Sequence, residues 1–237
     1  MKNLLITGAS KNLGKYLSEF FLQKDFNVIG VSKKSLPLKN KSNSYICDLS
    51  NYEKTLKLFK NLKKKYNKID YVISCAGYSK KTYKNIPSKK DWDISLNNNF
   101  FSNVNLINCY DKFFLRNNSK LLIISSIVTK KITKAPVTYS VSKAALNYYV
   151  SIKSKELSEK KAMLNLLLPG NILMKGNNWS KKLKKNKTLT NSYIKKNVPL
   201  GRFISPIEIA LYIEYYFNAE IKNLTGSEFV IDGGEVL

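Results

Sequence analysis

Histidine is absent from the 237 residues of this chain. This absence excludes catalytic triads built on an imidazole, HExxH metalloprotease sites and every other general base that needs a histidine. Acid–base chemistry must therefore come from tyrosine, lysine, aspartate or glutamate. Cysteine is scarce as well: Cys47, Cys75 and Cys109 lie far apart without paired spacing, which argues against a disulfide framework and a zinc site. We expect no bound metal and a reducing compartment.

Long apolar runs are also missing. No stretch approaches the roughly 20 residues that are needed to cross a bilayer. The segment from Met1 to Thr7 leads directly into a strand pattern and lacks the features of a secretion signal. We therefore expect a cytoplasmic protein with no membrane partner. The length fits a single domain, residues 1–237, that buries a full core of its own.

Arginine is represented only by Arg116 and Arg202, whereas lysine is so abundant that the net charge is +25. Lysine-rich surfaces bind phosphate backbones through counterion release, but base and phosphate recognition relies mostly on arginine. The lysines are also spread along the whole chain among Asn, Ile, Tyr and Phe, as in compositional drift. We expect no specific nucleic-acid partner, although nonspecific binding to polyanions is expected as a side effect.

Apolar strands alternate with helical patterns along the chain. The expected strands cover residues 3–7, 27–31, a short segment near Tyr45, 71–74, 121–125, 163–168 and 228–231. The expected helices cover residues 13–24, 52–66, 99–114, 139–159 and 206–217. The strands are continuously apolar, which indicates a parallel sheet that is covered on both faces. The predicted fold is α/β: a doubly wound, Rossmann-type sheet of about seven strands with helices on both faces.

Tyr139 and Lys143 stand four residues apart in an expected helix, and Ser126 lies thirteen residues before the tyrosine. Residues i and i+4 share one helix face. An ammonium at about 4 Å, in an effective dielectric of about 20, contributes roughly 4 kcal/mol, or about three pKa units. Lys143 could thus lower the pKa of Tyr139 from about 10 towards neutrality, while Ser126 orients a substrate oxygen. The spacing alone also fits an ordinary helix face with a solvated charge.

The loop from Thr7 to Gly14 joins the first expected strand to the first expected helix. Small residues there let a dinucleotide pyrophosphate approach the backbone and the helix N-terminus. A glycine turn after a strand can also be purely structural. The candidate cofactor-binding residues of this loop are Gly8, Ser10, Lys11, Asn12, Leu13 and Gly14.

With these segments in this order, the whole chain resembles the short-chain dehydrogenase/reductase family, especially its members similar to 3-oxoacyl-ACP reductases. The usual turn of the family reads Thr-Gly-x-x-x-Gly-x-Gly, and this chain has Asn12 in place of the middle glycine. Asparagine is among the few residues that tolerate positive φ, so we expect the turn to survive. The resemblance implies that Ser126, Tyr139 and Lys143 occupy catalytic positions.

Further motifs extend the resemblance. Asp48 and Leu49 resemble the adenine-contacting pair of the family, although an Asp before a helix is equally suited to be a cap. Ala76 and Gly77 match the end of the Asn-Asn-Ala-Gly segment of the family, whose two asparagines are replaced here. Asn99 falls on the helix asparagine that anchors a relay water in the family; its alternative is a polar residue inside a helix.

After the sixth expected strand, Pro169 and Gly170 match the segment that packs on the nicotinamide in the family. Met174 stands where the family often has a threonine that contacts the carboxamide. Methionine cannot make that hydrogen bond, so backbone groups such as those of Ile172 are expected to hold the nicotinamide. The C-terminal signature, from Gly201 to Gly234, lies at subunit interfaces in many relatives and implies a homodimer or homotetramer.

Cofactor preference follows from the residues after the second expected strand. NAD-specific sites place a carboxylate there, whereas an additional phosphate requires cations. The chain has Ser32, Lys33 and Lys34 at this place, with Lys11 in the glycine turn. We therefore expect NADP(H) to be preferred and NAD(H) to be possible, unless these lysines only belong to the general lysine excess.

Residues 175–197 are the one long interruption between expected elements and are predicted to form a lid over the substrate cleft. Asn177, Asn178 and Trp179 suit a sugar-like substrate, and the lysines of the segment suit a phosphate group or a merely solvated helix. The predicted function is an NADP(H)-dependent oxidoreductase acting on a carbonyl or alcohol, with sugar derivatives and acyl thioesters as the candidate substrates. The alternatives are a catalytically silent dinucleotide-binding sensor or structural subunit and a nucleic-acid binder.

Overall fold

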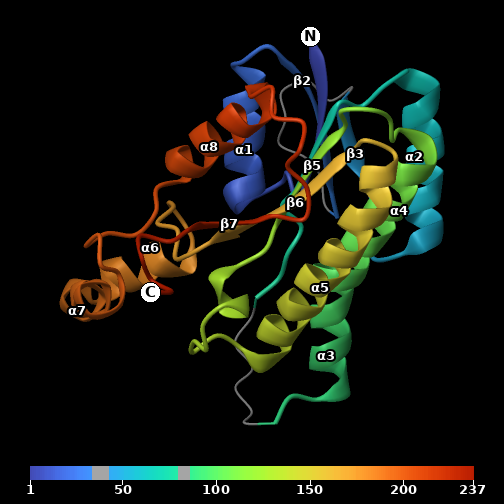
Figure 1. Cartoon of the computed structure of the whole chain (residues 1–237). Helices are drawn as coiled ribbons and strands as arrows, with labels where there is room; N and C mark the ends of the chain where they lie inside the picture. The colour runs from blue at the N-terminus through green and yellow to red at the C-terminus, as the bar shows by residue number, and fades with distance from the viewer. Residues whose placement is uncertain (34–42, 80–85) are drawn as a thin grey trace.

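The protein is built around one parallel β-sheet that carries helices on both faces (Figure 1). The computed structural model describes residues 1–33, 43–79 and 86–237. Within these residues the sheet has seven strands in the order β3-β2-β1-β4-β5-β6-β7. Their bounds are β1 (Lys2–Thr7), β2 (Phe26–Ser32), β3 (Ser44–Ile46), β4 (Tyr71–Ser74), β5 (Lys120–Ile124), β6 (Met163–Pro169) and β7 (Glu228–Ile231).

Every strand pairing is parallel, as the continuous apolar runs predict. β4, β5 and β6 consist entirely of buried residues. The strand order reverses direction between β1 and β4, and ligands of doubly wound sheets bind outside the carboxyl ends of the strands at such a switch point. The predicted fold class is confirmed, and β4 and β7 have the predicted bounds.

Two hydrophobic cores lie on opposite faces of the sheet. One core is shared with α2 (Tyr52–Lys65), α4 (Ser102–Phe113) and α5 (Val137–Glu159), and the other with α1 (Asn12–Leu22) and α8 (Pro206–Asn218). Successive residues of β1 alternate between them: Leu5 belongs to the first core, and Leu4 and Ile6 to the second. This alternation is the two-residue period of a strand that is buried on both faces.

The helix predicted over residues 99–114 is longer and is not uniform. It begins with α3 (Lys89–Leu96), where Ser88 and Asp91 form a capping box. A π-helical turn, Asn97–Phe101, then joins α3 to α4. π-Turns widen a helix locally and often occur at functional sites. Asn99, a predicted site residue, lies inside this turn.

The predicted lid segment, residues 175–197, forms two short helices, α6 (Asn178–Lys185) and α7 (Lys187–Asn197). Asn177 and Asn186 are their N-caps, and each accepts a hydrogen bond from a backbone N–H in the first turn. In Figure 1 the two helices lie to one side of the sheet, away from α2 and α4. None of the helices in the described ranges is both long and apolar enough to span a membrane.

Candidate active site

The glycine turn brings α1 unusually close to the end of β1. Gly8 has φ of 67° and Asn12 has φ of 51°, so Asn12 adopts the left-handed conformation expected of it. A Cβ added to Gly14 would lie 2.4 Å from the carbonyl oxygen of Gly8. Only glycine at position 14 allows this contact between helix and turn. The turn therefore keeps its shape without the middle glycine.

The N-terminus of α1 is suited to an anion. Its N-cap residue, Lys11, makes no side-chain capping bond, and its first turn contains no acidic residue. The positive end of the helix dipole and the first N–H groups can then bind a pyrophosphate. Ser10 lies half-buried in the turn, whereas the side chain of Leu13 packs in the core, so Leu13 can offer only its backbone. The small residues and this cradle fit a dinucleotide.

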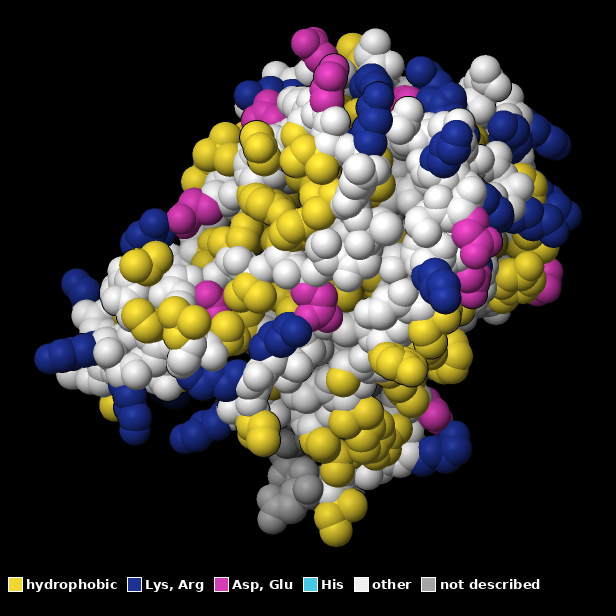
Figure 2. Space-filling view, in the orientation of Figure 1, with side chains coloured by type: hydrophobic (Ala, Val, Ile, Leu, Met, Phe, Trp, Pro, Cys, Tyr) yellow, Lys and Arg dark blue, Asp and Glu magenta, His cyan; other side chains and the backbone are white. Residues whose placement is uncertain are grey.

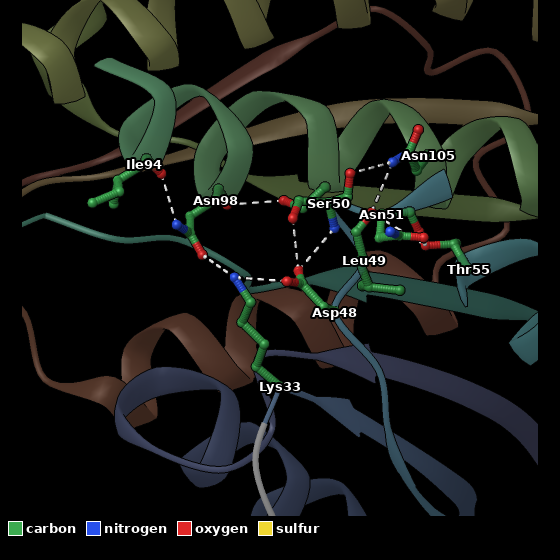
Figure 3. A network of polar contacts seen from close by, with 10 residues as sticks. Lys33, Asp48, Leu49, Ser50, Asn51, Thr55, Ile94, Asn98 and Asn105 are labelled. Atoms are coloured by element: carbon green, nitrogen blue, oxygen red, sulfur yellow. Dashed lines mark hydrogen bonds and ion pairs between the residues drawn. The ribbon is translucent and has the colours of Figure 1, made fainter. Parts of the chain in front are cut away.

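Lys33, at the end of β2, is held in a network of polar contacts (Figure 3). Its ammonium lies 3.0 Å from Oδ2 of Asp48 and donates to Oδ1 of Asn98 at 3.2 Å. The other oxygen of Asp48 accepts bonds from the N–H and hydroxyl of Ser50 at 3.1 and 2.7 Å. Partial burial opposes ionisation, but the bonds from Ser50 and Lys33 prevail and lower the pKa of Asp48.

Asp48 is not the cap of α2, because Asn51 is the N-cap residue and accepts from the N–H of Lys54 at 2.9 Å. Leu49 is buried, and its carbonyl accepts a bond from Asn105 at 2.9 Å. Ser32 is buried at the end of β2. Lys34, the remaining predicted phosphate contact, lies outside the described residues.

The segment after β4 approaches both the glycine turn and α5. A Cβ on Gly8 would lie 2.8 Å from the carbonyl oxygen of Cys75. The N–H of Ala76 donates to the hydroxyl of Thr7 at 3.3 Å. A Cβ on Gly77 would lie 3.8 Å from Nζ of Lys143. Burial raises the pKa of the Cys75 thiol to about 12, so this residue remains protonated.

Lys143 is 3% exposed, and its ammonium donates to the carbonyl oxygen of Ile124 at 2.8 Å. Burial lowers its pKa to about 8. Burial also raises the pKa of Tyr139, which a hydrogen bond with Ser126 only partly offsets. The expected lowering of the Tyr139 pKa by Lys143 is not seen in this arrangement. The physical reason is that the Lys143 ammonium points to the end of β5, whereas burial disfavours the charged phenolate form of Tyr139.

Asn99 links the π-turn to the loop after β4. Its Oδ1 accepts from the N–H of Tyr78 at 2.7 Å, and its Nδ2 donates to the carbonyl of the same residue at 3.0 Å. Nδ2 also lies 3.1 Å from the hydroxyl of Ser95 and 3.0 Å from that of Ser142. Asn99 is thus more than a polar residue inside a helix. Ser142 has no signal in the sequence other than its place between Tyr139 and Lys143.

The segment after β6 packs against the C-terminal end of the chain. The N–H of Gly170 donates to the carbonyl of Ile231 at 2.9 Å, and a Cβ on Gly170 would lie 2.8 Å from Cβ of Asp232. Pro169 ends β6 beside Ile231. The carbonyl of Ile172 accepts from Nδ2 of Asn177 at 2.7 Å, so the predicted contact of Ile172 with the nicotinamide falls to its N–H group.

Two side chains that were expected to suit a sugar form hydrogen bonds within the protein instead. Asn177 caps α6 through its Oδ1, which accepts from the N–H of Ser180 at 2.9 Å. The indole N–H of Trp179 donates to Oδ1 of Asn171 at 2.7 Å. Asparagine is a preferred N-cap residue, so an Asn directly before a helical segment is the signal that could have shown this role of Asn177.

The ends of β1, β4, β5 and β6 thus bring a dinucleotide cradle next to a tyrosine, a lysine and a serine. This combination of fold and site defines a nicotinamide-dependent dehydrogenase or reductase of the Rossmann type. A family model described as enoyl-(acyl carrier protein) reductase matches residues 25–235. The chain belongs to the short-chain dehydrogenase/reductase family, whose members are nicotinamide-dependent oxidoreductases. The predicted family and oxidoreductase class are confirmed.

Individual relatives agree with this assignment. The chain is 26% identical over 247 residues to the 3-oxoacyl-[acyl-carrier-protein] reductase FabG of Thermotoga maritima, covering 100% of this chain and 98% of that protein. Thermoplasma acidophilum aldohexose dehydrogenase has a similar structure, with a TM-score of 0.86, 22% identity, and coverage of 98% of this chain and 93% of that chain. The RhlG/NADP active-site complex of Pseudomonas aeruginosa has a TM-score of 0.84 at 19% identity, and coverage is 100% and 96%.

We expect NADPH binding to weaken as the pH rises through about 8. The pKa of Lys143 is lowered to about 8 by burial, so its positive charge is present below this pH and is lost above it. The dissociation constant, measured by NADPH fluorescence between pH 7 and 9.5, should rise by up to about tenfold per pH unit above the pKa. In the Lys143→Met variant the dissociation constant should be higher at neutral pH and should not change with pH. A flat curve for the unmodified protein would contradict the role of this charge.

Proposed function

We propose that the protein is an NADPH-dependent reductase whose substrate is a 3-oxoacyl thioester. The observation that carries the proposal is the convergence of Ser126, Tyr139 and Lys143 at the sheet edge where the glycine turn of α1 forms its cradle. A bound nicotinamide supplies the hydride that is added to the carbonyl carbon. Side chains of the protein orient the substrate and donate the proton.

Tyr139 is the proton donor in this proposal. Because its pKa is raised, the phenol carries its proton throughout the neutral range and can give it to the carbonyl oxygen as that oxygen gains negative charge. The hydroxyl of Ser126 binds the same carbonyl oxygen and is hydrogen-bonded to the phenol, so that it orients the two groups for proton transfer. Lys143, charged below about pH 8, holds the nicotinamide ribose. Asn99 supports a relay water that returns the proton.

The thioester is favoured over a sugar for two reasons. Two relatives that match 98% or more of the chain are named as 3-oxoacyl-[acyl-carrier-protein] reductases. The polar groups of Asn177 and Trp179 that suited a sugar are used for capping and for a bond to Asn171. We further propose that residues 175–197 act as the substrate lid of a single catalytic domain, residues 1–237.

Acetoacetyl thioesters should be reduced with consumption of NADPH, and the Tyr139→Phe variant should lose about 100-fold or more in turnover, because it cannot donate the proton. Absorbance of NADPH measures the rate, and the panel also includes aldohexoses with NADPH and secondary alcohols with NADP⁺. Tyr52→Phe is the matched control: this tyrosine lies on α2 and is 45% exposed, and the change should leave the rate unchanged. Equal rates for the unmodified protein and Tyr139→Phe would refute the mechanism.

We propose that NADP(H) is preferred over NAD(H). Ser32, Lys33 and Lys11 support this, and the contacts of Lys33 with Asp48 and Asn98 keep its ammonium at the end of β2. The Asp48 carboxylate competes with a phosphate for the same cation, so the preference is expected to be moderate.

Lys33→Ala should weaken NADPH binding by about three- to tenfold, since the lost contact is half exposed, and should change NADH binding little. Titration of both cofactors measures this, and Lys57→Ala, an exposed change on α2, is the control. Tighter binding of NADH than NADPH by the unmodified protein would refute the proposed preference.

We also propose a homodimer or homotetramer. Hydrophobic side chains gather over α8 and β7 and over the lower end of α5 on the face in Figure 2. On α5, Val141, Tyr148 and Ile152 are 45%, 73% and 51% exposed, at positions that share one helix face. Exposed apolar faces of this kind mark interaction surfaces. A cytoplasmic location stays a prediction from the sequence.

The double variant Tyr148→Glu/Ile152→Glu should sediment as a smaller species than the unmodified protein in analytical ultracentrifugation. The carboxylates would have to be buried without partners in an interface formed by α5, which is strongly unfavourable. Ser158→Glu, an exposed change near the end of the same helix, should leave the mass unchanged. Identical masses for the double variant and the unmodified oligomer would exclude this face of α5 as a subunit interface.

The alternative of a silent sensor or structural subunit is not favoured. The family consists of oxidoreductases, and the tyrosine, lysine and serine of the site are all present and lie together.

A further inference from the structure

The carboxylate of Glu235, two residues before the end of the sequence, lies inside the protein. The residue is 3% exposed. Its Oε1 accepts from Nδ2 of Asn171 at 2.6 Å and from the hydroxyl of Tyr193 at 2.8 Å. Its Oε2 accepts from the N–H of Asn171 at 3.4 Å. Because Asn171 follows β6 and Tyr193 belongs to α7, one side chain joins the predicted lid to the loop after β6.

The same residue also contacts the loop that follows Ser126. The backbone carbonyl of Glu235 accepts from Nζ of Lys131 at 2.6 Å. A Cβ added to Gly170 would lie 3.1 Å from Oε2 of Glu235. Three segments that border the proposed substrate site therefore meet at Glu235: the loop after β5, the loop after β6, and α7.

No lysine or arginine of the described residues forms an ion pair with this carboxylate. A buried carboxylate without a cation is costly, and an apolar side chain would fill the same space at lower cost. Its hydrogen bonds compensate only if the donors stay in place. Burial, and next the hydrogen bond to Glu235, raise the pKa of Tyr193 to about 12, so this hydroxyl remains a donor at neutral pH.

The C-terminal turn is built to point Glu235 inwards. Both oxygens of Asp232 accept from backbone N–H groups, Oδ1 from Gly234 and Oδ2 from Val236, each at 2.8 Å. Gly233 and Gly234 have φ of 70° and 86°. These left-handed conformations favour glycine and reverse the chain directly before Glu235.

Asn171 extends the contact from α7 to α6. Its Oδ1 accepts the indole N–H of Trp179 at 2.7 Å. The ring centroid of Trp179 lies 4.8 Å from that of Tyr193 and 4.5 Å from that of Phe203. Glu235 thus holds α7 directly through Tyr193 and α6 indirectly through Asn171 and Trp179.

We propose that Glu235 is a positioning residue that holds both lid helices against the loop after β6 and thereby sets the affinity for the carbonyl substrate. The inference rests on the proposed function for its kinetic consequence, but the attachment of the lid is independent of any activity.

The test uses Trp92→Phe as the background, so that Trp179 is the only tryptophan. Glu235→Ala should shift Trp179 emission to the red and increase its quenching by acrylamide, because the indole becomes more exposed. The KM for the thioester should rise about tenfold while kcat changes less than about threefold, the pattern of lost substrate binding. The dissociation constant of NADPH should rise less than the KM, because the α1 cradle is untouched and only the loop that carries Ile172 is loosened.

Two further variants separate positioning from folding. Glu235→Gln keeps an oxygen for Asn171 and Tyr193 and should recover most of the KM. Tyr193→Phe removes only one hydroxyl and should also raise the KM, with an effect that is not additive with that of Glu235→Ala. Glu220→Gln, an exposed change with the same loss of charge, is the control and should resemble the background.

A variant Glu235→Ala that melts at a lower temperature but keeps the emission, quenching and KM of the background would overturn the proposal. If that variant does not fold, Tyr193→Phe decides: unchanged quenching and KM would likewise overturn it. If no carbonyl is reduced by the unmodified protein, the proposed function fails, while the quenching of Trp179 still shows whether Glu235 holds the lid.

Discussion

The buried contact between the Lys143 ammonium and the Ile124 carbonyl is the interaction on which the site depends. It joins α5 to the end of β5, and it places Tyr139, one helical turn earlier, beside Ser126. A buried ammonium is stable only where acceptors surround it, so the chain must keep α5 in this register. The cost of burial appears in the lowered pKa of Lys143, which leaves its charge dependent on pH near neutrality.

Parallel strand order supplies the rest of the geometry. Because all strands run in one direction, the turn after β1, the segment after β4 and the loops after β5 and β6 meet at one edge. Gly14 permits the helix to approach this edge, and Asn99 fastens the segment after β4 to the π-turn. The cofactor cradle and the acid–base side chains are thus neighbours because of the topology, although they come from distant parts of the sequence.

Patterns in the sequence predicted those features that depend on local periodicity or spacing. The order of strands and helices, the bounds of β4 and the positive φ of Asn12 are examples. Features that depend on burial or on long-range partners could not be predicted in this way. The π-turn at Asn99 has no residue pattern of its own, and the raised pKa of Tyr139 follows from burial that spacing does not reveal. The pairing of Lys33 with Asp48 could not be predicted either, because only the fold brings these two residues together.

Direct transfer of hydride from the nicotinamide to the substrate carbon can be followed with an isotope label. NADPH carrying deuterium at C4 of the nicotinamide would be used to reduce an acetoacetyl thioester, and the product would be analysed by mass spectrometry. The 3-hydroxyacyl product should carry one deuterium on the carbon of the former carbonyl when the label is on the transferred face of C4. Direct transfer would be contradicted if the product lacks deuterium both with the label on one face of C4 and with the label on the other. It would also be contradicted if no product forms despite bound NADPH.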